Sequence, residues 1–455
     1  MKKLKFLFFP TILVLAFGLV LSCAKSSSDN SSSSDNSSSS DYEAPNCDGN
    51  NKGSFQIHPE KVTGVGVGMV KNKKDCGYAL VGSKNRRPWF QVLDEKGNHL
   101  MSKTYDVFGN YKTSSIFIAN GLEAEGSLKG SAISQTNDSG YIVGTMPPGH
   151  PSYGYSWIFK TNAQGEIEWK RELKYKSGKK SVIHFVSDII QTNDGHYVAV
   201  GYTSGDIGNK IKGQGFMTKI DKDDGTEKWM KRFGSNACIF DTLNSVLEDN
   251  ENNLIAIGKY EKPCPKYGCH HGYACGDVYF LKISPATGET LISKRHAPNK
   301  WWANGGSILQ LDDGSFIVGG KIRADKRNAS NSAVWRFNHN GEMVWSQPWK
   351  GTASRENNDV HNENVSALAL SPQRDAVIAV GFKYTRSGIE NQNGDMMAWS
   401  MDLNGTQKWI KRYEVPGWQA ASDITQIKNN RYLLSGGRKW FFEIDSDGKL
   451  IKIHK

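Results

Sequence analysis

Residues 191–234, QTNDGHYVAVGYTSGDIGNKIKGQGFMTKIDKDDGTEKWMKRFG, contain the unit that is repeated along most of this chain. The unit holds an Asx-Gly turn, a strand that ends in Gly, a variable loop, a strand that mixes apolar residues with Lys, a second Gly turn and a strand that carries Trp. With the apolar strand that precedes it, each unit has four short strands, and the pattern occurs seven times. Repeats of this kind are typical of β-propeller blades. The sequence therefore predicts an all-β fold: a single seven-bladed β-propeller of four-stranded antiparallel blades.

The Gly that ends the second strand gives the register of the repeats. These glycines are Gly82, Gly144, Gly201, Gly258, Gly319, Gly381 and Gly436. Their spacing leaves no room for another domain between two repeats. The strands before them are apolar at successive positions, as expected for strands that are packed between two neighbouring blades.

A second turn, rich in Asp, Asn and Gly, joins the third and fourth strands of each repeat, as such residues favour tight hairpins. Trp169, Trp229, Trp345 and Trp409 stand just beyond this turn in four repeats. A large aromatic side chain repeated at one position is expected to fill the gap between adjacent blades. Alternating acids at 221–223 and 445–447 lack the distal Glu of a calcium loop, which favours a role in the turn.

The first residues have the pattern of an export signal. Lys2, Lys3 and Lys5 precede an apolar run over residues 6–21. The next residues, VLSC at 20–23, resemble a bacterial lipobox, which implies cleavage before Cys23 and attachment of a diacylglycerol and an N-acyl chain to it. Residues 26–41 are only Ser, Asp and Asn, and cannot form an apolar core. We expect a signal peptide at 1–22, a lipidated and disordered tether at 23–46 and the propeller at 47–455.

The turn and the Trp together carry a family resemblance. DGTEKW at residues 224–229 and TGE at 287–289 resemble the D-x-x-T-G-x-x-x-W repeat of the PQQ-like propeller superfamily. The resemblance covers the chain from about residue 60 onward. That superfamily includes quinoprotein dehydrogenases and also cofactor-free lipoproteins of the outer membrane. The resemblance therefore implies a fold more than an activity.

Charge and composition exclude few functions. The chain has 23% charged residues and a formal net charge of +11, and its Lys and Arg residues are spread through every repeat. Such a distribution is typical of a solvated surface. No RNA-binding signature or helix with a basic face occurs, so we do not expect a nucleic-acid partner.

The two faces of the propeller should differ, because strand direction alternates within a blade. Only short turns fall on the face of the first-to-second and third-to-fourth connections. The long insertions, among them residues 173–186 and 382–394, fall on the other face, and long loops are where binding residues accumulate. From that face we select as binding candidates Phe108, Tyr273, His296, Trp301, Trp302, His361 and Trp418.

Small or polar residues recur on the first strands, close to the predicted axis. They include Ser131, Asp188 and Asp423. We expect the two acids to line a solvated channel rather than to catalyse a reaction.

Six cysteines follow Cys23, and they are Cys47, Cys76, Cys238, Cys264, Cys269 and Cys275. An even number in an exported chain favours disulfides, and we expect one bridge between Cys47 and Cys76 and two among the other four. Two alternatives exist for the spacing C-x4-C-H: a c-type haem site with His270 as the iron ligand, or a zinc site. The weak candidate metal ligands are Cys264, Cys269, His270, His271 and Cys275.

No Ser elbow, H-E-x-x-H, phosphate loop or dinucleotide motif occurs in the sequence. We therefore expect a monomeric, cofactor-free and non-enzymatic binding or scaffold module. It would be anchored by lipid in the outer membrane, on its periplasmic or external side, and would bind a protein or glycan through the long-loop face. The alternative is a quinone- or haem-dependent oxidoreductase of the PQQ-like superfamily.

Overall fold

The chain divides into two units, Met1–Glu43 and Ala44–Lys455, and every described residue belongs to the second. The structure, a computed structural model, describes residues 65–72, 76–84, 87–105, 129–146, 156–177, 180–203, 213–234, 241–263, 275–297, 302–323, 330–348, 360–387, 391–414, 420–427, 430–436 and 441–454. These residues form β-strands and turns only. None of them belongs to a helix long and apolar enough to cross a membrane.

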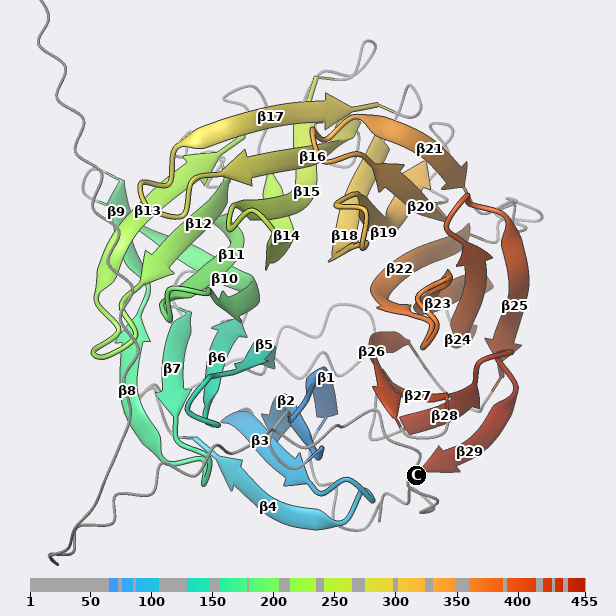
Figure 1. Cartoon of the computed structure of the whole chain (residues 1–455), viewed down its shortest axis with the longest axis horizontal. Helices are drawn as coiled ribbons and strands as arrows, with labels where there is room; N and C mark the ends of the chain where they lie inside the picture. The colour runs from blue at the N-terminus through green and yellow to red at the C-terminus, as the bar shows by residue number, and fades with distance from the viewer. Residues whose placement is uncertain are drawn as a thin grey trace, which may run out of the picture. The chain divides into compact units, whose positions relative to one another are not determined.

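The strands form seven blades arranged as a ring, and each blade contains four consecutive strands that pair antiparallel in chain order (Figure 1). Blade 1 contains β1 (Val65–Lys71), β2 (Tyr78–Lys84), β3 (Arg87–Leu93) and β4 (His99–Thr104), and blade 2 contains β5 (Lys129–Gln135), β6 (Tyr141–Met146), β7 (Trp157–Thr161) and β8 (Ile167–Glu172). Blade 3 contains β10 (Lys180–Gln191), β11 (Tyr197–Thr203), β12 (Gly215–Ile220) and β13 (Glu227–Phe233), with the short β9 (Lys174–Ser177) added beside β10.

Blades 4 and 5 form one continuous sheet because β16 and β18 share a single parallel pair, Gly276 with Trp302. Blade 4 contains β14 (Thr242–Glu248), β15 (Leu254–Lys262), β16 (Cys275–Ile283) and β17 (Thr290–His296), and blade 5 contains β18 (Trp302–Gln310), β19 (Phe316–Arg323), β20 (Asn331–Phe337) and β21 (Met343–Pro348). Blade 6 contains β22 (Val360–Leu370), β23 (Ala376–Ser387), β24 (Asn391–Asp402) and β25 (Gln407–Tyr413), and blade 7 contains β26 (Ala421–Ile427), β27 (Arg431–Gly436), β28 (Phe441–Asp445) and β29 (Leu450–His454). The predicted all-β, seven-bladed fold is confirmed.

The hydrophobic core lies between the blades. Among the described residues there are seven apolar clusters, and each is shared by two neighbouring blades. The second strands contribute to a cluster on either side: Val198 and Val200 pack toward blade 4, whereas Ala199 packs toward blade 2. Blade 7 consists entirely of C-terminal strands, so the ring closes by packing of whole blades 1 and 7 and not by exchange of a strand.

Every innermost strand contains one β-bulge, and a glycine of the second strand often lies opposite it. Gly201 pairs with Val186 at the bulge of blade 3, where a Cβ would overlap the carbonyl oxygen of Phe185. Only a residue without a side chain fits this close approach.

The bulges correct the register predicted for two blades. In blade 2 the residue at the place of Gly201 is Thr145, one position after the predicted Gly144, and in blade 5 it is Gly320, one position after Gly319. Gly144 is required for another reason, because a Cβ there would lie 2.5 Å from Val186 Cγ1 of the next blade. Likewise Ser131 occupies the bulge itself, and Ala132 is the residue equivalent to Asp188.

The repeated Trp residues join adjacent blades as expected. Trp229 of blade 3 donates from Nε1 to the carbonyl oxygen of Pro285 in blade 4, over 3.1 Å. The same contact links Trp169 to Lys222, and the equivalent pairs continue around the ring with Trp345 to Leu403 and Trp409 to Ser446. Each indole also covers the Gly of the turn that it reaches. The Trp residues therefore pin the outer strand of one blade to the turn of the next.

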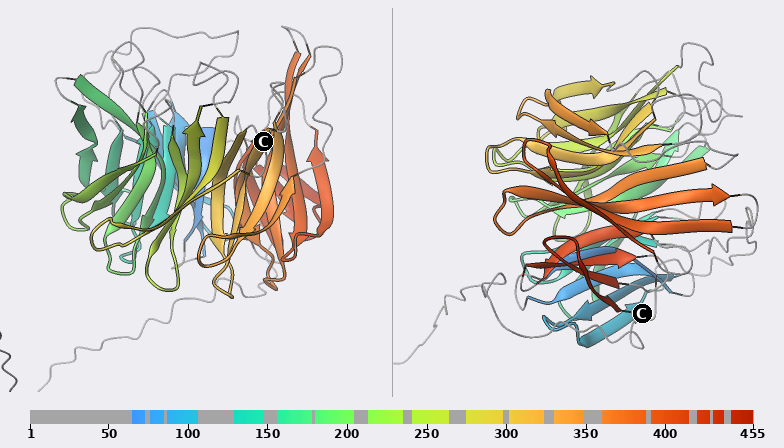
Figure 2. Two further views of the ribbon diagram at one scale, coloured as in Figure 1. Left: turned by 90° about the horizontal axis from the view of Figure 1, so that it is seen from above. Right: turned by 90° about the vertical axis from the view of Figure 1, so that its right-hand side faces the viewer.

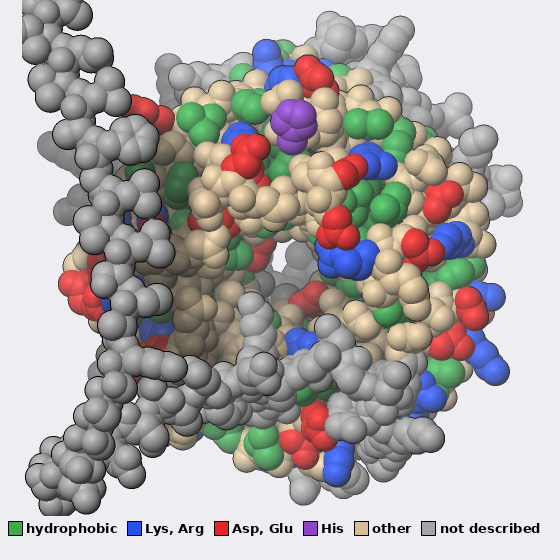
Figure 3. Space-filling model, in the orientation of Figure 1, with side chains coloured by type: hydrophobic (Ala, Val, Ile, Leu, Met, Phe, Trp, Pro, Cys, Tyr) green, Lys and Arg blue, Asp and Glu red, His purple; other side chains and the backbone are tan. Residues whose placement is uncertain are grey.

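Ion pairs between a largely buried cation and an acid of the first turn close the same end of the blades. Lys160 of β7 is only 2% exposed, and its Nζ lies 2.7 Å from Asp138 in the first turn of its own blade. Lys219, Lys282 and Arg336 occupy the same place on the third strands of blades 3, 4 and 5, and each pairs with acids of its own first turn. We name this side, with all first-to-second and third-to-fourth turns, the tight-turn face. Figure 3 views the ring from this side and shows acidic and basic groups next to one another around a central opening.

The opposite side carries the second-to-third and blade-to-blade connections, and we name it the long-loop face. Two insertions that the sequence suggested to be loops consist largely of strand (Figure 2). β9 and β10 occupy most of residues 173–186, and β23 and β24 extend through residues 382–394 except for 388–390. Backbone pairing continues past the blade there, because each arm finds an antiparallel partner in the other.

Candidate functional site

A group of cations surrounds Trp302 on the long-loop face, where blades 4 and 5 meet. Lys321 Nζ lies 5.0 Å from the centre of the indole ring, Arg323 Cζ 5.6 Å and Lys259 Nζ 5.9 Å. These are cation–π distances. All four side chains are partly buried, so they combine reduced hydration with some access to solvent. We name these four residues the Trp302 cluster.

Strand pairing places the members of the cluster together. Trp302 is the first residue of β18 and lies directly across from Arg323, the last residue of β19. Its backbone pairs on the other side with Gly276, and a Cβ at Gly276 would lie 3.1 Å from both Trp302 Cδ1 and Lys259 Cγ. The indole and the lysine stem therefore depend on the missing side chain at position 276.

Burial and neighbouring cations determine the protonation of Lys321. Burial, followed by the neighbouring charges of Lys259 and Arg323, lowers the pKa of Lys321 to about 8. Lys259 is paired with Glu261, with 2.7 Å between Nζ and Oε1. No salt bridge joins Lys321 to an acid in the part of the chain that the structure describes.

The rest of the blade 4 rim is occupied by internal pairs. The guanidinium of Arg295 lies 4.6 Å from the ring centre of Tyr260, and Lys262 forms an ion pair with Asp277. These contacts neutralise or cover the charges beside the cluster, and so its positive charge stays local.

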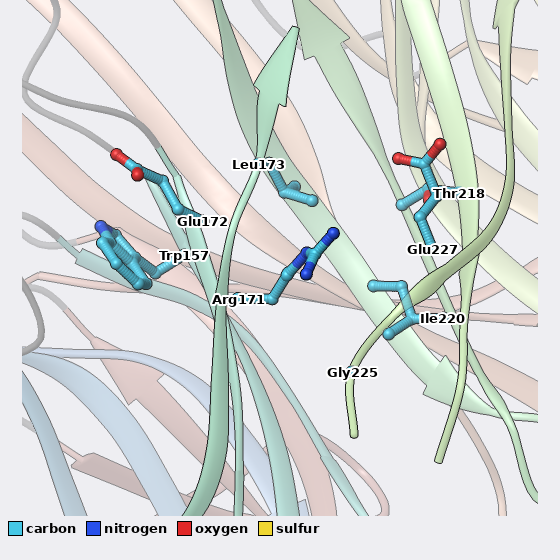
Figure 4. Close-up of a pocket in the computed structure, with 8 residues that line it drawn as sticks. All are labelled: Trp157, Arg171, Glu172, Leu173, Thr218, Ile220, Gly225 and Glu227. Atoms are coloured by element: carbon cyan, nitrogen blue, oxygen red, sulfur yellow. The ribbon is translucent and has the colours of Figure 1, made fainter. Parts of the chain in front are cut away.

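A cleft of about 350 Å³ opens between the outer strands of blades 2 and 3. It is lined by Trp157, Arg171, Glu172, Leu173, Thr218, Ile220, Gly225 and Glu227, and Figure 4 shows Arg171 and Glu227 on its opposite sides. Burial raises the pKa of Glu227, while the charge of Arg171 opposes that shift. The cleft includes Gly225, which Trp169 covers, so it is part of a repeated joint between blades.

The two acids near the axis do more than line a channel. Asp188 accepts hydrogen bonds at Oδ2 from Val246 N and from Ser245 Oγ of blade 4, at 3.0 and 2.9 Å. Asp423 accepts one at Oδ2 from Met69 N of blade 1, at 2.8 Å. The structure thus gives the two acids a role that the sequence did not predict: each acid holds the inner strand of the next blade, and Asp423 does so where the ring closes.

Burial raises the pKa of both acids, to about 6 for Asp188 and about 7 for Asp423. The backbone hydrogen bonds oppose this rise, and for Asp423 the charge of Asp188 adds to it.

The structure places few of the predicted site residues in one group. Trp302 lies in the cation cluster, whereas His296 ends β17, where its Nε2 donates to Gly341 O at 2.8 Å and its ring packs on Phe337. His296 thus contacts the tight turn of blade 5. His361 lies in β22, with its side chain outside the described part. Outside it altogether are Cys23, Phe108, Tyr273, Trp301 and Trp418.

Cys76 takes part in a disulfide, and so does Cys275. The pairing of the six cysteines stays a prediction, because Cys47, Cys238, Cys264 and Cys269 lie outside the described residues, as do His270 and His271. Within the described ranges, no group of three or more His, Cys, Asp or Glu residues could hold a metal ion.

Sequence reasoning did not single out Lys259, Lys321 and Arg323. A signal was present, however, since Lys259 and Lys321 each follow the glycine opposite the bulge. Equivalent places in blades 1, 2, 3 and 6 hold Ser83, Met146, Tyr202 and Phe382. A basic residue there is therefore a property of the two blades that flank Trp302.

Comparisons with known proteins bear on the fold alone. No family model and no curated protein matches the sequence. Among solved structures, the quinohemoprotein alcohol dehydrogenase of Comamonas testosteroni is similar, with 11% identity, a TM-score of 0.49, and 88% of this chain and 70% of that chain covered. The WD40 domain of Neurospora crassa Pan2 has 10% identity and a TM-score of 0.46, with 85% and 90% covered.

YCF48 bound to D1 peptide has 10% identity and a TM-score of 0.44, with 88% of this chain and 96% of that chain covered. The strand pairing described above, and not these likenesses, carries the assignment as a propeller. At such low identity none of them transfers an activity or a partner to this chain.

Proposed function

We propose that this chain is a lipid-anchored protein of the bacterial outer membrane whose propeller is a non-enzymatic binding module for a protein partner. Cys23 would carry the lipid, residues 23–46 would form a flexible tether, and the long-loop face would meet the partner. No cofactor is required for this role. The lipobox-like residues 20–23 and the Ser-rich segment support the anchor and the tether.

The observation that carries the proposal is the unequal use of polar and aromatic groups on the two faces. On the tight-turn face these groups repeat from blade to blade and bond to the protein itself, as Trp229 and Lys219 do. On the long-loop face, as far as the structure describes it, Lys259, Lys321 and Arg323 surround Trp302, and blades 1, 2, 3 and 6 have no cation at the place of the two lysines. Aromatic and Arg side chains that are not required for folding are typical of protein-binding surfaces.

The proposal is tested with the full-length chain in its native envelope. Affinity capture after chemical crosslinking should recover one partner, and the variant Trp302→Ala should lose it. Lys222→Ala, on the tight-turn face, should retain it, because the side chain of Lys222 forms a salt bridge with the adjacent Asp223 at an exposed turn. Capture that survives Trp302→Ala contradicts the choice of face.

Two further measurements test the anchor and the alternative function. Metabolic labelling with a radioactive fatty acid should mark the wild-type chain and not Cys23→Ser. Addition of pyrroloquinoline quinone and calcium should produce no dye reduction with alcohols, and any turnover under these conditions would favour the oxidoreductase instead.

A further inference from the structure

The cleft between blades 2 and 3 lies at a junction that apolar side chains fill in other blades. In blades 2, 5 and 7 the outer strand begins with an apolar residue that packs against the cluster shared with the preceding blade. In blade 3 the outer strand begins with Glu227, which pairs after the bulge as those residues do. Glu227 is the only acid among the first residues of the seven described outer strands, the others being His99, Ile167, Thr290, Met343, Gln407 and Leu450.

Arg171, on the opposite wall of the cleft, also differs from its equivalents. It is the fifth residue of β8, and the fifth residue of β17 is Lys294, which forms an ion pair with Glu342 in the turn of the next blade, over 3.2 Å. Lys103 of blade 1 forms the same kind of pair. The residue at the place of Glu342 in blade 3 is Thr226, so the repeat supplies no carboxylate to Arg171.

The hydrogen-bonding capacity of the two charged groups is unused within the described part of the chain. Neither the guanidinium of Arg171 nor the carboxylate of Glu227 has a hydrogen bond or an ion pair there. The charges of Asp224 and Glu227 act on Arg171 from beyond the distance of an ion pair. Burial raises the pKa of Glu227, although the residue reaches solvent. The cleft therefore presents both hydrogen-bond donors and acceptors to one space.

The base of the cleft is apolar. Leu173 and Ile220 are buried and belong to the cluster between blades 2 and 3. Figure 4 shows the side chains of Trp157 and Glu172 on the other side of β8, as alternation along a strand requires. The volume of about 350 Å³ lies at the lower end of the range for ligand pockets, which is about 300–1,000 Å³.

We infer that this cleft binds one pyranose ring of a neutral sugar, with its hydroxyl groups bonded to Arg171 and Glu227 and its apolar face on the base of the cleft. A hydroxyl group can accept from a guanidinium and donate to a carboxylate. The two opposite charges disfavour a simple anion or cation. The inference goes beyond the proposed function, which does not require it, because the cleft and Trp302 lie at different junctions.

A zwitterionic ligand would also meet both charges, but it fits the exposure of the site less well. Ion pairs between groups that reach solvent gain little free energy, because each charge must lose part of its hydration. A hydroxyl group bonded to a charged side chain gains more, since the hydroxyl is desolvated at a lower cost. The half-open cleft therefore favours a polyol.

Saturation-transfer difference NMR of the purified full-length chain, in a detergent that contains no sugar, tests the inference. The probes are methyl α-glucopyranoside, methyl β-galactopyranoside, methyl α-mannopyranoside and N-acetylglucosamine, with alanine as the zwitterionic comparison. A single sugar ring is expected to bind with a Kd of about 1–10 mM, from the number of its atoms. At least one of the pyranoses should receive saturation at its ring protons.

Three variants separate binding from folding. Glu227→Met places the residue of Met343 at the junction, and it should abolish the pyranose signal with a melting temperature at or above that of the wild type, because an apolar side chain fills the cleft. Arg171→Gln should weaken binding at least about tenfold, since it removes hydrogen bonds to a charged group. Lys231→Gln changes the equivalent position of β13 and should retain the signal.

Four outcomes overturn the inference. The first is the absence of a signal from every pyranose, and the second is a signal that survives Glu227→Met or Arg171→Gln. The third is a signal from alanine alone that these variants remove, which assigns the cleft to a zwitterion. The fourth is a lower melting temperature in Glu227→Met, which assigns Glu227 to the framework of the junction. Equal loss in Lys231→Gln would also contradict a site at this one junction.

Discussion

The tight-turn face and the long-loop face of this propeller are made by the same seven repeats, yet they use similar side chains in opposite ways. On the tight-turn face, Trp229 bonds to the next blade and Lys160 is buried against Asp138. On the long-loop face, Trp302 is surrounded by Lys321 and other cations, and its position does not belong to the series of Trp residues that recur from blade to blade. Side-chain type alone therefore does not distinguish a structural group from a binding group; repetition around the ring and satisfaction by internal partners do.

The comparison also separates two kinds of stability. Contacts on the tight-turn face recur, so each junction between blades resembles the others. The stability of the ring is then the sum of similar free-energy contributions from these junctions. Contacts at the long-loop face are individual, and their loss should affect binding more than folding. Changes at the two faces should therefore differ in size and in kind.

The largest effect is expected where the inner strands approach most closely. Gly201→Ala should lower the free energy of unfolding by about 3 kcal/mol, because the added methyl group would overlap Phe185 O and lie 2.9 Å from Phe216 Cε1. Gly314→Ala serves as a control: nothing lies within 4 Å of its added Cβ, and only the positive φ of 78° opposes it, at a cost of about 1 kcal/mol. Urea unfolding followed by tryptophan fluorescence compares the two. Equal losses would show that close approach of the strands is not the limiting factor.

Two tryptophans provide an intermediate effect and the most direct comparison of the faces. Trp229→Ala should cost about 2 kcal/mol, since it removes a partly buried ring from above Gly288 and the hydrogen bond to Pro285. Trp302→Ala should cost less than about 1 kcal/mol, since the ring gains only cation–π attraction from Lys259, Lys321 and Arg323 and belongs to none of the apolar clusters. Thermal unfolding of the two variants tests this order. If Trp302→Ala is the less stable variant, then Trp302 belongs to the structural framework.

The effect that is smallest at neutral pH concerns the acid that closes the ring. The pKa of Asp423 is raised from 3.8 to about 7 in the folded chain, so the folded state binds its proton more tightly than the unfolded state does. Its contribution to the free energy of unfolding must therefore fall as pH rises through this range. Asp423→Asn, which keeps an oxygen to accept from Met69 N, should remove this dependence, which the shift from 3.8 to about 7 sets at about 4 kcal/mol between pH 4 and 8.

Asp188→Asn is the matched comparison for the ring-closing acid. It should remove a similar dependence that ends at a lower pH, because the pKa of Asp188 is raised to about 6. Unfolding measured at several pH values distinguishes the two variants. An unchanged pH profile in Asp423→Asn would show that this carboxyl group does not titrate with a raised pKa.

Much of the fold could be predicted because the interactions that form a blade are local in the sequence. Strands that are apolar at successive positions and the two Asx-Gly turns identified seven blades, and Trp229 joins its neighbour as expected. The register at Gly144 and Gly319 was wrong by one residue, since the bulges that set it have no sequence signature of their own. Of two adjacent glycines such as Gly319 and Gly320, the one that lies opposite the bulge can be identified only when the pairing with the opposing strand is known.

The candidate site was predicted only in part. Trp302 was selected as an unrepeated aromatic, but Lys259 and Lys321 lie 62 positions apart in the sequence and belong to different blades. Asp188 and Asp423 were identified as near the axis, whereas their backbone partners in the following blades were not. These omissions share one cause: each contact joins two blades.

The sequence by itself determined the number of blades, their strands and the residues of their tight turns, because backbone pairing within a blade connects neighbours along the chain and follows from short apolar runs and turn chemistry. Only the tertiary structure decided which unrepeated side chains of neighbouring blades meet. That choice depends on how one twisted sheet packs against the next, and it brings Lys259, Trp302 and Lys321 together at the junction of blades 4 and 5.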